Sequence, residues 1–206
     1  NSLKPESTAY LEGTSEGLAG ISDMVFLDEN FAGLDQACLA IVTRGTGHVA
    51  LVNPTFLING AVDVMGSIQL GGVLTHVVAD DSTGDLVVAD AKTRRIYRIS
   101  AADLLNGVDG TSGIKIDFAA RDLLYHQGAV WVATGGSLLK LEADTLEEEN
   151  IQAVAVGSVT RQALSSGGLA VATRTRIRNY VVEDMSDPVD ISGADAHKIT
   201  TFVSGQ

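Results

Sequence analysis

The sequence predicts an all-β chain of four similar units that form a β-propeller-like domain. Three observations support this fold class. The apolar runs are short and rich in Val, Leu, Ile and Ala. The 206 residues include 22 Gly but only 3 Pro. One strand–turn–strand pattern recurs along the chain. Short strands with tight turns at regular spacing are typical of antiparallel all-β architectures.

The recurring pattern is an apolar strand that ends in Thr or Asp, a short polar turn and a second apolar strand. Its four copies occupy residues 37–52, 85–99, 129–141 and 168–182. A short apolar stretch precedes each copy, at 24–27, 77–79, 123–125 and 163–164, and another follows it, at 64–70, 114–118, 152–156 and 199–203. Each unit therefore has four expected strands, and a four-stranded unit of about 40–45 residues matches a propeller blade.

Two other all-β folds fit this pattern less well. An immunoglobulin-like sandwich does not need repeated units, and a β-helix repeats at a much shorter period. One short helix is expected at residues 100–106, between a Ser cap and Gly107. The repeat occupies residues 21–206, whereas residues 1–20 are polar and are expected to form an arm or a closing strand.

The second unit reads VLTHVVADDSTGDLVVADAKTRRIYRIS over residues 73–100 and resembles NHL and YVTN propeller repeats. The third unit is similar to a lesser degree, and residues 179–188 resemble the DxSDP ending of related blades. The resemblance implies a propeller fold and a scaffold role, and it transfers no catalytic residues. A closed four-bladed ring, an arc of a larger ring and a ring completed by further copies all remain open.

Charge and composition exclude several classes of function. The net charge is −12, with 26 acidic and 14 basic residues, so we expect no nucleic-acid partner, because the domain repels phosphate backbones. No apolar run approaches the roughly 18 residues of a membrane span. The chain begins at Asn1 without a leader sequence. We therefore expect either a removed leader or a segment of a longer chain. Separately, we expect an extracellular or virion-associated setting, as part of a larger assembly.

The first candidate site lies at the start of the inner strands, which point toward the axial opening of a propeller. Aligning the units places four polar residues there, with a further polar residue before each. The first set is Asp23, His76, Asp122 and Gln162, and the second is Ser22, Thr75, Arg121 and Arg161. Two carboxylates and an imidazole could hold one divalent cation. The alternative is a solvated channel mouth in which the acids pair with the nearby arginines.

The second candidate site is a basic cluster in the fourth unit. Arg161, Arg174, Arg176 and Arg178 lie within 18 positions of an otherwise acidic chain. They could contact an acidic partner, including the acidic turns of another copy. They could equally form a basic strand edge that resists aggregation.

Several other residues have structural interpretations. Asp80–Asp85 (DDSTGD) is expected to form a hairpin turn, since it lacks the length and the closing Glu of a calcium loop. Cys38 and Trp131 are expected in the core. Asp90 aligns with Thr43, Thr134 and Thr173, and each is expected to accept a backbone hydrogen bond that fixes the following turn.

These observations favour a non-catalytic binding or structural module, with a protein partner or self-association and no cofactor. The chain contains none of the common nucleophile, zinc-protease, phosphate-loop or dinucleotide motifs. One alternative is a metal-dependent propeller hydrolase or lactonase that uses Asp23, His76 and Asp122. A second is a carbohydrate-binding propeller, for which Tyr97 and Tyr180 are the candidate stacking residues.

Overall fold

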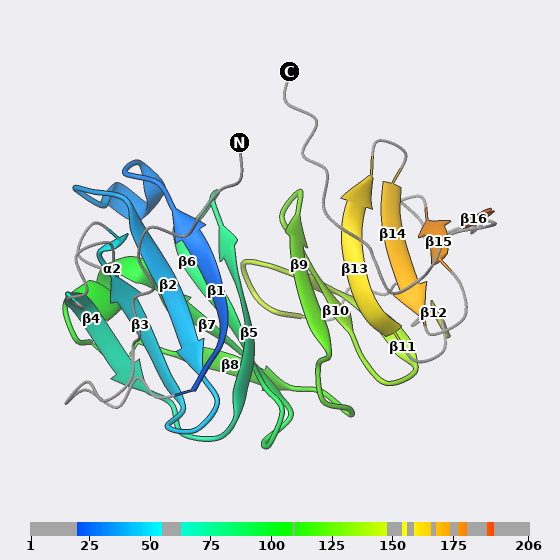
Figure 1. The fold of residues 1–206 in the computed structure, drawn as a ribbon, viewed down its shortest axis with the longest axis horizontal. Helices are drawn as coiled ribbons and strands as arrows, with labels where there is room; N and C mark the ends of the chain where they lie inside the picture. The colour runs from blue at the N-terminus through cyan, green and yellow to red at the C-terminus, as the bar shows by residue number, and fades with distance from the viewer. Residues whose placement is uncertain are drawn as a thin grey trace, which may run out of the picture. The chain divides into compact units, whose positions relative to one another are not determined.

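The computed structural model describes residues 20–54, 63–108, 110–147, 154–155, 159–165, 168–173, 177–180 and 189–191. These residues form four antiparallel sheets of four strands each (Figure 1). Within every sheet the strands neighbour one another in chain order, so each sheet is a simple meander. The chain divides into two compact units, residues 1–116 with the first two sheets and residues 117–206 with the other two.

The first unit begins with the sheet of β1 (Ile21–Leu27), β2 (Cys38–Thr43), β3 (His48–Val52) and β4 (Val64–Gln69). A short 3-10 helix, η1 (Phe31–Gly33), lies between β1 and β2. The second sheet contains β5 (Leu74–Asp80), β6 (Asp85–Asp90), β7 (Arg95–Ser100) and β8 (Ser112–Lys115), with helix α2 (Ala101–Leu105) after β7.

The second unit repeats the same plan. Its first sheet contains β9 (Asp122–His126), β10 (Ala129–Ala133), β11 (Ser137–Glu142) and β12 (Val154–Ala155). Its second sheet contains β13 (Val159–Ser165), β14 (Gly168–Thr173), β15 (Ile177–Tyr180) and β16 (Val189–Ile191). The predicted all-β, four-unit, propeller-like organisation is therefore confirmed.

The outermost strands were the least well predicted. The fourth strand of the last sheet is β16, which pairs with β15, and not residues 199–203, which lie outside the described residues. The outer strand expected at residues 114–118 is β8, which instead covers Ser112–Lys115. Of the strand expected at residues 152–156, the structure describes only Val154–Ala155, which form β12. Alternating apolarity marked these segments correctly as extended. It could not choose among neighbouring candidates, because the hydrogen-bonded register and a short connection decide which segment joins the sheet.

The core of the first unit lies between its two sheets. Ala40, Val42, Val49 and Leu51 of the first sheet belong to one buried cluster with residues of the second sheet, including Leu86. The alternate residues Ile41, Ala50 and Val52 form a separate buried cluster. All six residues of β6 are buried as well. Because the central strands are buried along their whole length, they read as continuous apolar runs rather than as alternating ones.

Helix α2 forms where the sequence predicted it. The Ser100 hydroxyl accepts a hydrogen bond from the Asp103 N–H at 3.4 Å, and Gly107 follows the helix with φ 65°. The helix packs on the first sheet so closely that a Cβ atom at Gly66 of β4 would overlap the carbonyl oxygen of Leu104. No helix in the described ranges is long and apolar enough to cross a membrane.

Candidate functional site

A β-bulge interrupts the start of the inner strand in three of the four sheets. The register shifts after Ile21 in β1, after Leu74 in β5 and after Val159 in β13. The third sheet has a related arrangement, because the Arg121 N–H donates to the Ala133 oxygen at 2.7 Å while Asp122 pairs with the same Ala133. Bulges of this kind change the direction of a side chain, which makes these positions natural candidates for a site.

The strand pairing shows that the sequence alignment of the fourth unit has to be shifted by one residue. Arg161, and not Gln162, is the residue directly after the bulge, because Arg161 pairs with Ala172 and Gln162 pairs with the next residue, Val171. The equivalent residues of the four sheets are therefore Asp23, His76, Asp122 and Arg161. The sequence alignment was one residue out here because a short apolar stretch does not define the register of a strand, which only the pairing with its neighbour decides.

Asp23 and Ser22 connect the two sheets of the first unit. One Asp23 carboxylate oxygen accepts a hydrogen bond from the Val77 N–H of β5 at 3.0 Å, and the other accepts from the adjacent Met24 N–H at 3.0 Å. The Ser22 hydroxyl lies 2.7 Å from the Leu74 carbonyl oxygen and 3.2 Å from that of Val42. These polar side chains therefore hold β1 beside β5.

The other three bulge-adjacent residues are in different settings. His76 is half-buried, and its Nδ1 lies 3.0 Å from the Thr75 hydroxyl. Asp122 is buried in the second unit, and the Arg161 side chain lies outside the described part. Among the described residues, no three His, Cys, Asp or Glu side chains form a group that could hold a metal ion. The Asp23 carboxylate is instead bonded to backbone N–H groups.

The predicted arginine cluster is only partly described. Arg161 belongs to β13 and Arg178 to β15, where Arg178 pairs with Val171 on one side and Asp190 on the other. Arg161 pairs with Ala172, which follows directly after Val171 in β14. Arg174 and Arg176 come between β14 and β15 in the sequence, outside the described residues. The proposal that these arginines contact an acidic partner therefore stays a prediction.

Asp90 fixes the turn between β6 and β7. Its Oδ1 accepts hydrogen bonds from the N–H groups of Lys92 at 2.8 Å, Val73 at 3.0 Å and Thr93 at 3.2 Å, and its Oδ2 accepts from the Thr93 hydroxyl at 2.6 Å. Burial would raise the pKa of this carboxyl, but the hydrogen bonds from Thr93, Val73 and Lys92 outweigh it and lower the pKa. The predicted turn-fixing role of Asp90 is confirmed.

Two of the aligned threonines also accept a backbone hydrogen bond that fixes the following turn. The Thr43 hydroxyl oxygen accepts from the His48 N–H at 2.8 Å, and that of Thr134 accepts from the Ser137 N–H at 3.0 Å. Asp90 differs from them because its Oδ1 also accepts from the N–H of Val73, which precedes β5, while its second oxygen accepts from the Thr93 hydroxyl. The sequence alignment did not indicate this additional contact.

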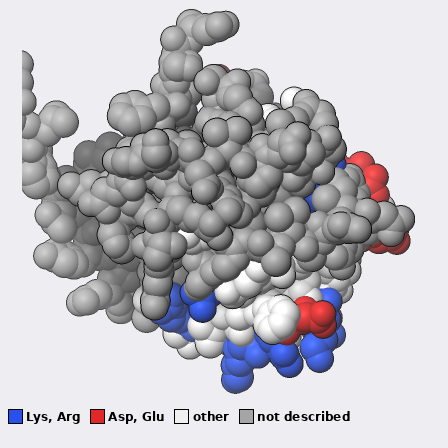
Figure 2. Space-filling view, turned by 90° about the vertical axis from the view of Figure 1, so that its right-hand side faces the viewer, with Lys and Arg blue, Asp and Glu red and all other residues white. Residues whose placement is uncertain are grey.

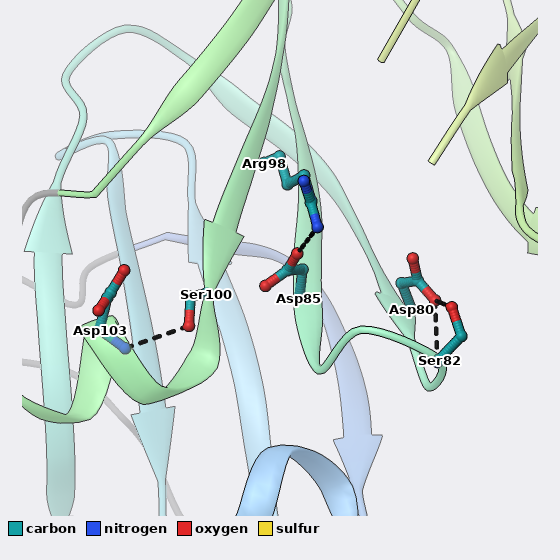
Figure 3. Close-up of polar contacts among 6 residues, drawn as sticks. All are labelled: Asp80, Ser82, Asp85, Arg98, Ser100 and Asp103. Carbon is teal, nitrogen blue, oxygen red and sulfur yellow. Dashed lines mark hydrogen bonds and ion pairs between the residues drawn. The ribbon is translucent and has the colours of Figure 1, made fainter. Parts of the chain in front are cut away.

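The acidic segment between β5 and β6 is a hairpin turn, as predicted (Figure 3). Asp80 Oδ1 accepts hydrogen bonds from the Ser82 N–H at 2.9 Å and the Ser82 hydroxyl at 2.6 Å. Asp85 forms an ion pair with Arg98, which projects from the neighbouring strand β7. The carboxylates of Asp80 and Asp85 therefore have local structural partners.

The cysteine and the tryptophan are core residues, as predicted. Cys38 is fully buried, and burial raises the pKa of its thiol to about 11. Trp131 is 1% exposed. Tyr97 is half-buried and packs against the core of the first unit, whereas the Tyr180 side chain lies outside the described part. The sequence did not indicate that Met24, Phe26 and Phe118 would be exposed.

Comparisons with solved structures show the fold. No protein-family model and no curated protein matches the chain. The chain is similar to hydrazine synthase of Kuenenia stuttgartiensis, with a TM-score of 0.66 and 11% identity over 89% of this chain and 53% of that one. It is also similar to virginiamycin B lyase from Staphylococcus aureus, with a TM-score of 0.59 and 12% identity over 83% of this chain and 55% of that one.

A third similar structure is BBS1N in complex with ARL6DN, with a TM-score of 0.57 and 14% identity over 81% of this chain and 55% of that one. The chain thus spans about half the length of these structures. It has a β-propeller-type fold. The narrower resemblance to NHL and YVTN repeats is not confirmed and stays a prediction.

Proposed function

We propose that this chain is a non-catalytic binding module, a propeller-type scaffold that contacts a partner protein through its exposed turns. The observation that carries this proposal is the use of the inner polar residues. Ser22, Asp23 and Asp90 direct their oxygen atoms to backbone groups that join strands and fix turns. Side chains engaged in this way maintain the scaffold, which leaves contact with other molecules to the exposed turns.

The similar structures agree with this proposal without deciding it. Their names include two enzymes, a synthase and a lyase, and one protein that is in complex with another protein. A propeller scaffold supports many unrelated functions, so function has to be argued from the residues of this chain.

The test is to immobilise the chain, recover bound proteins from its native source, and rebuild the complex from purified components. We expect one protein to bind at a fixed stoichiometry in native mass spectrometry. A chain that binds no protein would contradict the proposal. So would stoichiometric metal after dialysis against calcium-containing buffer, or selective binding on a glycan array, since these results favour the hydrolase and the carbohydrate-binding alternatives.

A further inference from the structure

The turns of the first unit lie at two opposite ends of its strands, and each end forms a rim. The β2–β3 turn lies beside the start of β1, because the Arg44 N–H donates to the Gly20 oxygen at 2.9 Å. The β6–β7 turn lies beside the start of β5, because the Ala91 N–H donates to the Val73 oxygen at 2.9 Å. Since Ser22 and Asp23 join β1 to β5 at this same end, the two turns belong to one rim. They lie at the lower edge of the first unit in Figure 1.

Exposed basic residues gather on this rim, which we call the basic rim. It carries Arg44 in the β2–β3 turn, Lys92, Arg94 and Arg95 in and after the β6–β7 turn, and Lys115 at the end of β8. Arg95 pairs with Lys115 across adjacent strands, so two cations are neighbours. Figure 2 shows Lys and Arg side chains at the lower edge of the view, with Asp or Glu atoms among them.

The carboxylates of the first unit lie mainly at the other end of the strands. Asp28, Glu29 and Asp35 occupy the β1–β2 connection, Asp80, Asp81 and Asp85 the β5–β6 hairpin, and Asp63 and Asp103 the connections before β4 and after β7. Asp23 and Asp90 lie on the basic rim, and both accept backbone hydrogen bonds. The exposed Asp117 follows Ile116, whose N–H donates to the Arg94 oxygen, so one further carboxylate lies beside the rim. The chain as a whole is strongly acidic, so this separation of charge is the property that distinguishes the rim.

Four of the five cations of the rim are available for a partner. Within the described ranges, Arg44, Lys92, Arg95 and Lys115 form no ion pair. The turn that carries Lys92 is held rigid, because Asp90 binds the Lys92 and Thr93 N–H groups. A rigid turn presents its side chains without a large ordering cost when a partner binds.

The backbone of this turn is left-handed at Arg94. Arg94 has φ 57°, and the corresponding residue of the β2–β3 turn is Gly47, with φ 66°. Glycine adopts this left-handed conformation without steric cost, whereas other residues are strained there. The second sheet therefore keeps an exposed arginine at a position that favours glycine.

We propose that the basic rim binds an acidic segment of a partner protein. Arg and Lys side chains donate charge-assisted hydrogen bonds to carboxylates, and arginine does so in a bidentate geometry. A short acidic peptide segment can contact this rim alone. A long polyanion such as a nucleic acid would also meet the remaining surface of a chain with net charge −12. This inference rests on the proposed binding function and names the class of partner.

The test uses decaglutamate peptide as the probe and two variants of the full chain with the same net charge. The double variant Lys92→Gln/Arg95→Gln removes two cations from the basic rim. The control Asn30→Asp/Gln36→Glu adds the same amount of negative charge at exposed positions of the β1–β2 connection. We expect the rim variant to bind the peptide about tenfold more weakly and the control to bind it nearly as well as the wild type.

Three outcomes would overturn the proposal. They are peptide binding that does not depend on the rim, equal weakening of binding by both variants, and tighter binding of a ten-nucleotide oligothymidylate than of the peptide at the same salt concentration. The protein recovered in the functional experiment separates this inference from the proposed function. If that protein binds the wild type and the Lys92→Gln/Arg95→Gln variant equally, the binding function stands and the assignment to the basic rim is wrong.

Discussion

Replacement of Asp90 tests how the turns of this fold are stabilised. The carboxylate is 1% exposed and accepts bonds from three backbone N–H groups and one hydroxyl. Asp90→Ala leaves the Lys92 and Thr93 N–H groups to bond with water at an exposed turn, whereas the Val73 N–H is half-buried. Since hydrogen bonds to an ionised group contribute about 1.5–3 kcal/mol, we expect a loss of about 2–4 kcal/mol in the free energy of unfolding.

This loss exceeds the value of about 1 kcal/mol that a local turn bond alone would give. The difference comes from the bond to Val73, which joins the start of β5 to the end of β6. Asp90→Asn keeps one carbonyl oxygen for the backbone bonds and should cost about 1 kcal/mol. Asp90→Thr reproduces the turn bonds seen at Thr43 and Thr134 but lacks the second oxygen, so it should fall between Asn and Ala.

Urea unfolding at neutral pH, extrapolated linearly to water, measures this series. The expected order of stability is wild type, Asp90→Asn, Asp90→Thr and Asp90→Ala. If Asp90→Thr is no more stable than Asp90→Ala, the turn bonds are not the source of the effect. If all the variants unfold like the wild type, the carboxylate has no structural role, and a role in ligand binding becomes the better explanation.

Three further predictions concern other contacts in the first unit. Asp23→Ala should speed hydrogen exchange of the Val77 amide about fivefold, and unchanged exchange would show that the link between the sheets is unimportant. Gly66→Ala should lower the melting temperature because its Cβ overlaps the backbone of α2, whereas Gly136→Ala, with open space around it, should not; equal melting temperatures would refute this steric argument. Folding lowers the pKa of Asp90, so the stabilisation from its carboxylate is present above about pH 4 and is lost as the pH falls through the folded-state pKa. The difference in unfolding free energy between wild type and Asp90→Asn should therefore shrink in acid. A difference that grows in acid would contradict the direction of this pKa shift.

Much of the fold could be predicted from local pattern. Central strands such as β6 and β10 are buried along their length, so their inner residues are apolar, and polar residues such as Asp85 and Asp90 mark the ends of β6. The helix at α2 was predictable from Ser100 and Gly107, since caps act within one turn of the chain. The outer strands were less predictable, because an edge strand is selected by pairing rather than by composition.

The candidate site was only partly predictable. The sequence located Asp23 and Asp90 as special positions, and it correctly gave Asp90 a structural role. It could not show that Asp23 binds the Val77 N–H, because that contact joins residues 54 positions apart. It also placed Gln162 where the sheet has Arg161, because the pairing of β13 with β14, and not the apolar pattern, decides the register.

The sequence by itself determined the strand-rich character, the four-fold repetition and the turn residues, because these follow from interactions between near neighbours in the chain. Only the tertiary structure decided which side chains link the two sheets and which remain exposed. It also showed that five basic residues from separate turns and strands, Arg44, Lys92, Arg94, Arg95 and Lys115, share one rim. A meander brings alternate turns to the same end of its strands, so charges scattered along the chain become neighbours only after the sheets have formed and packed.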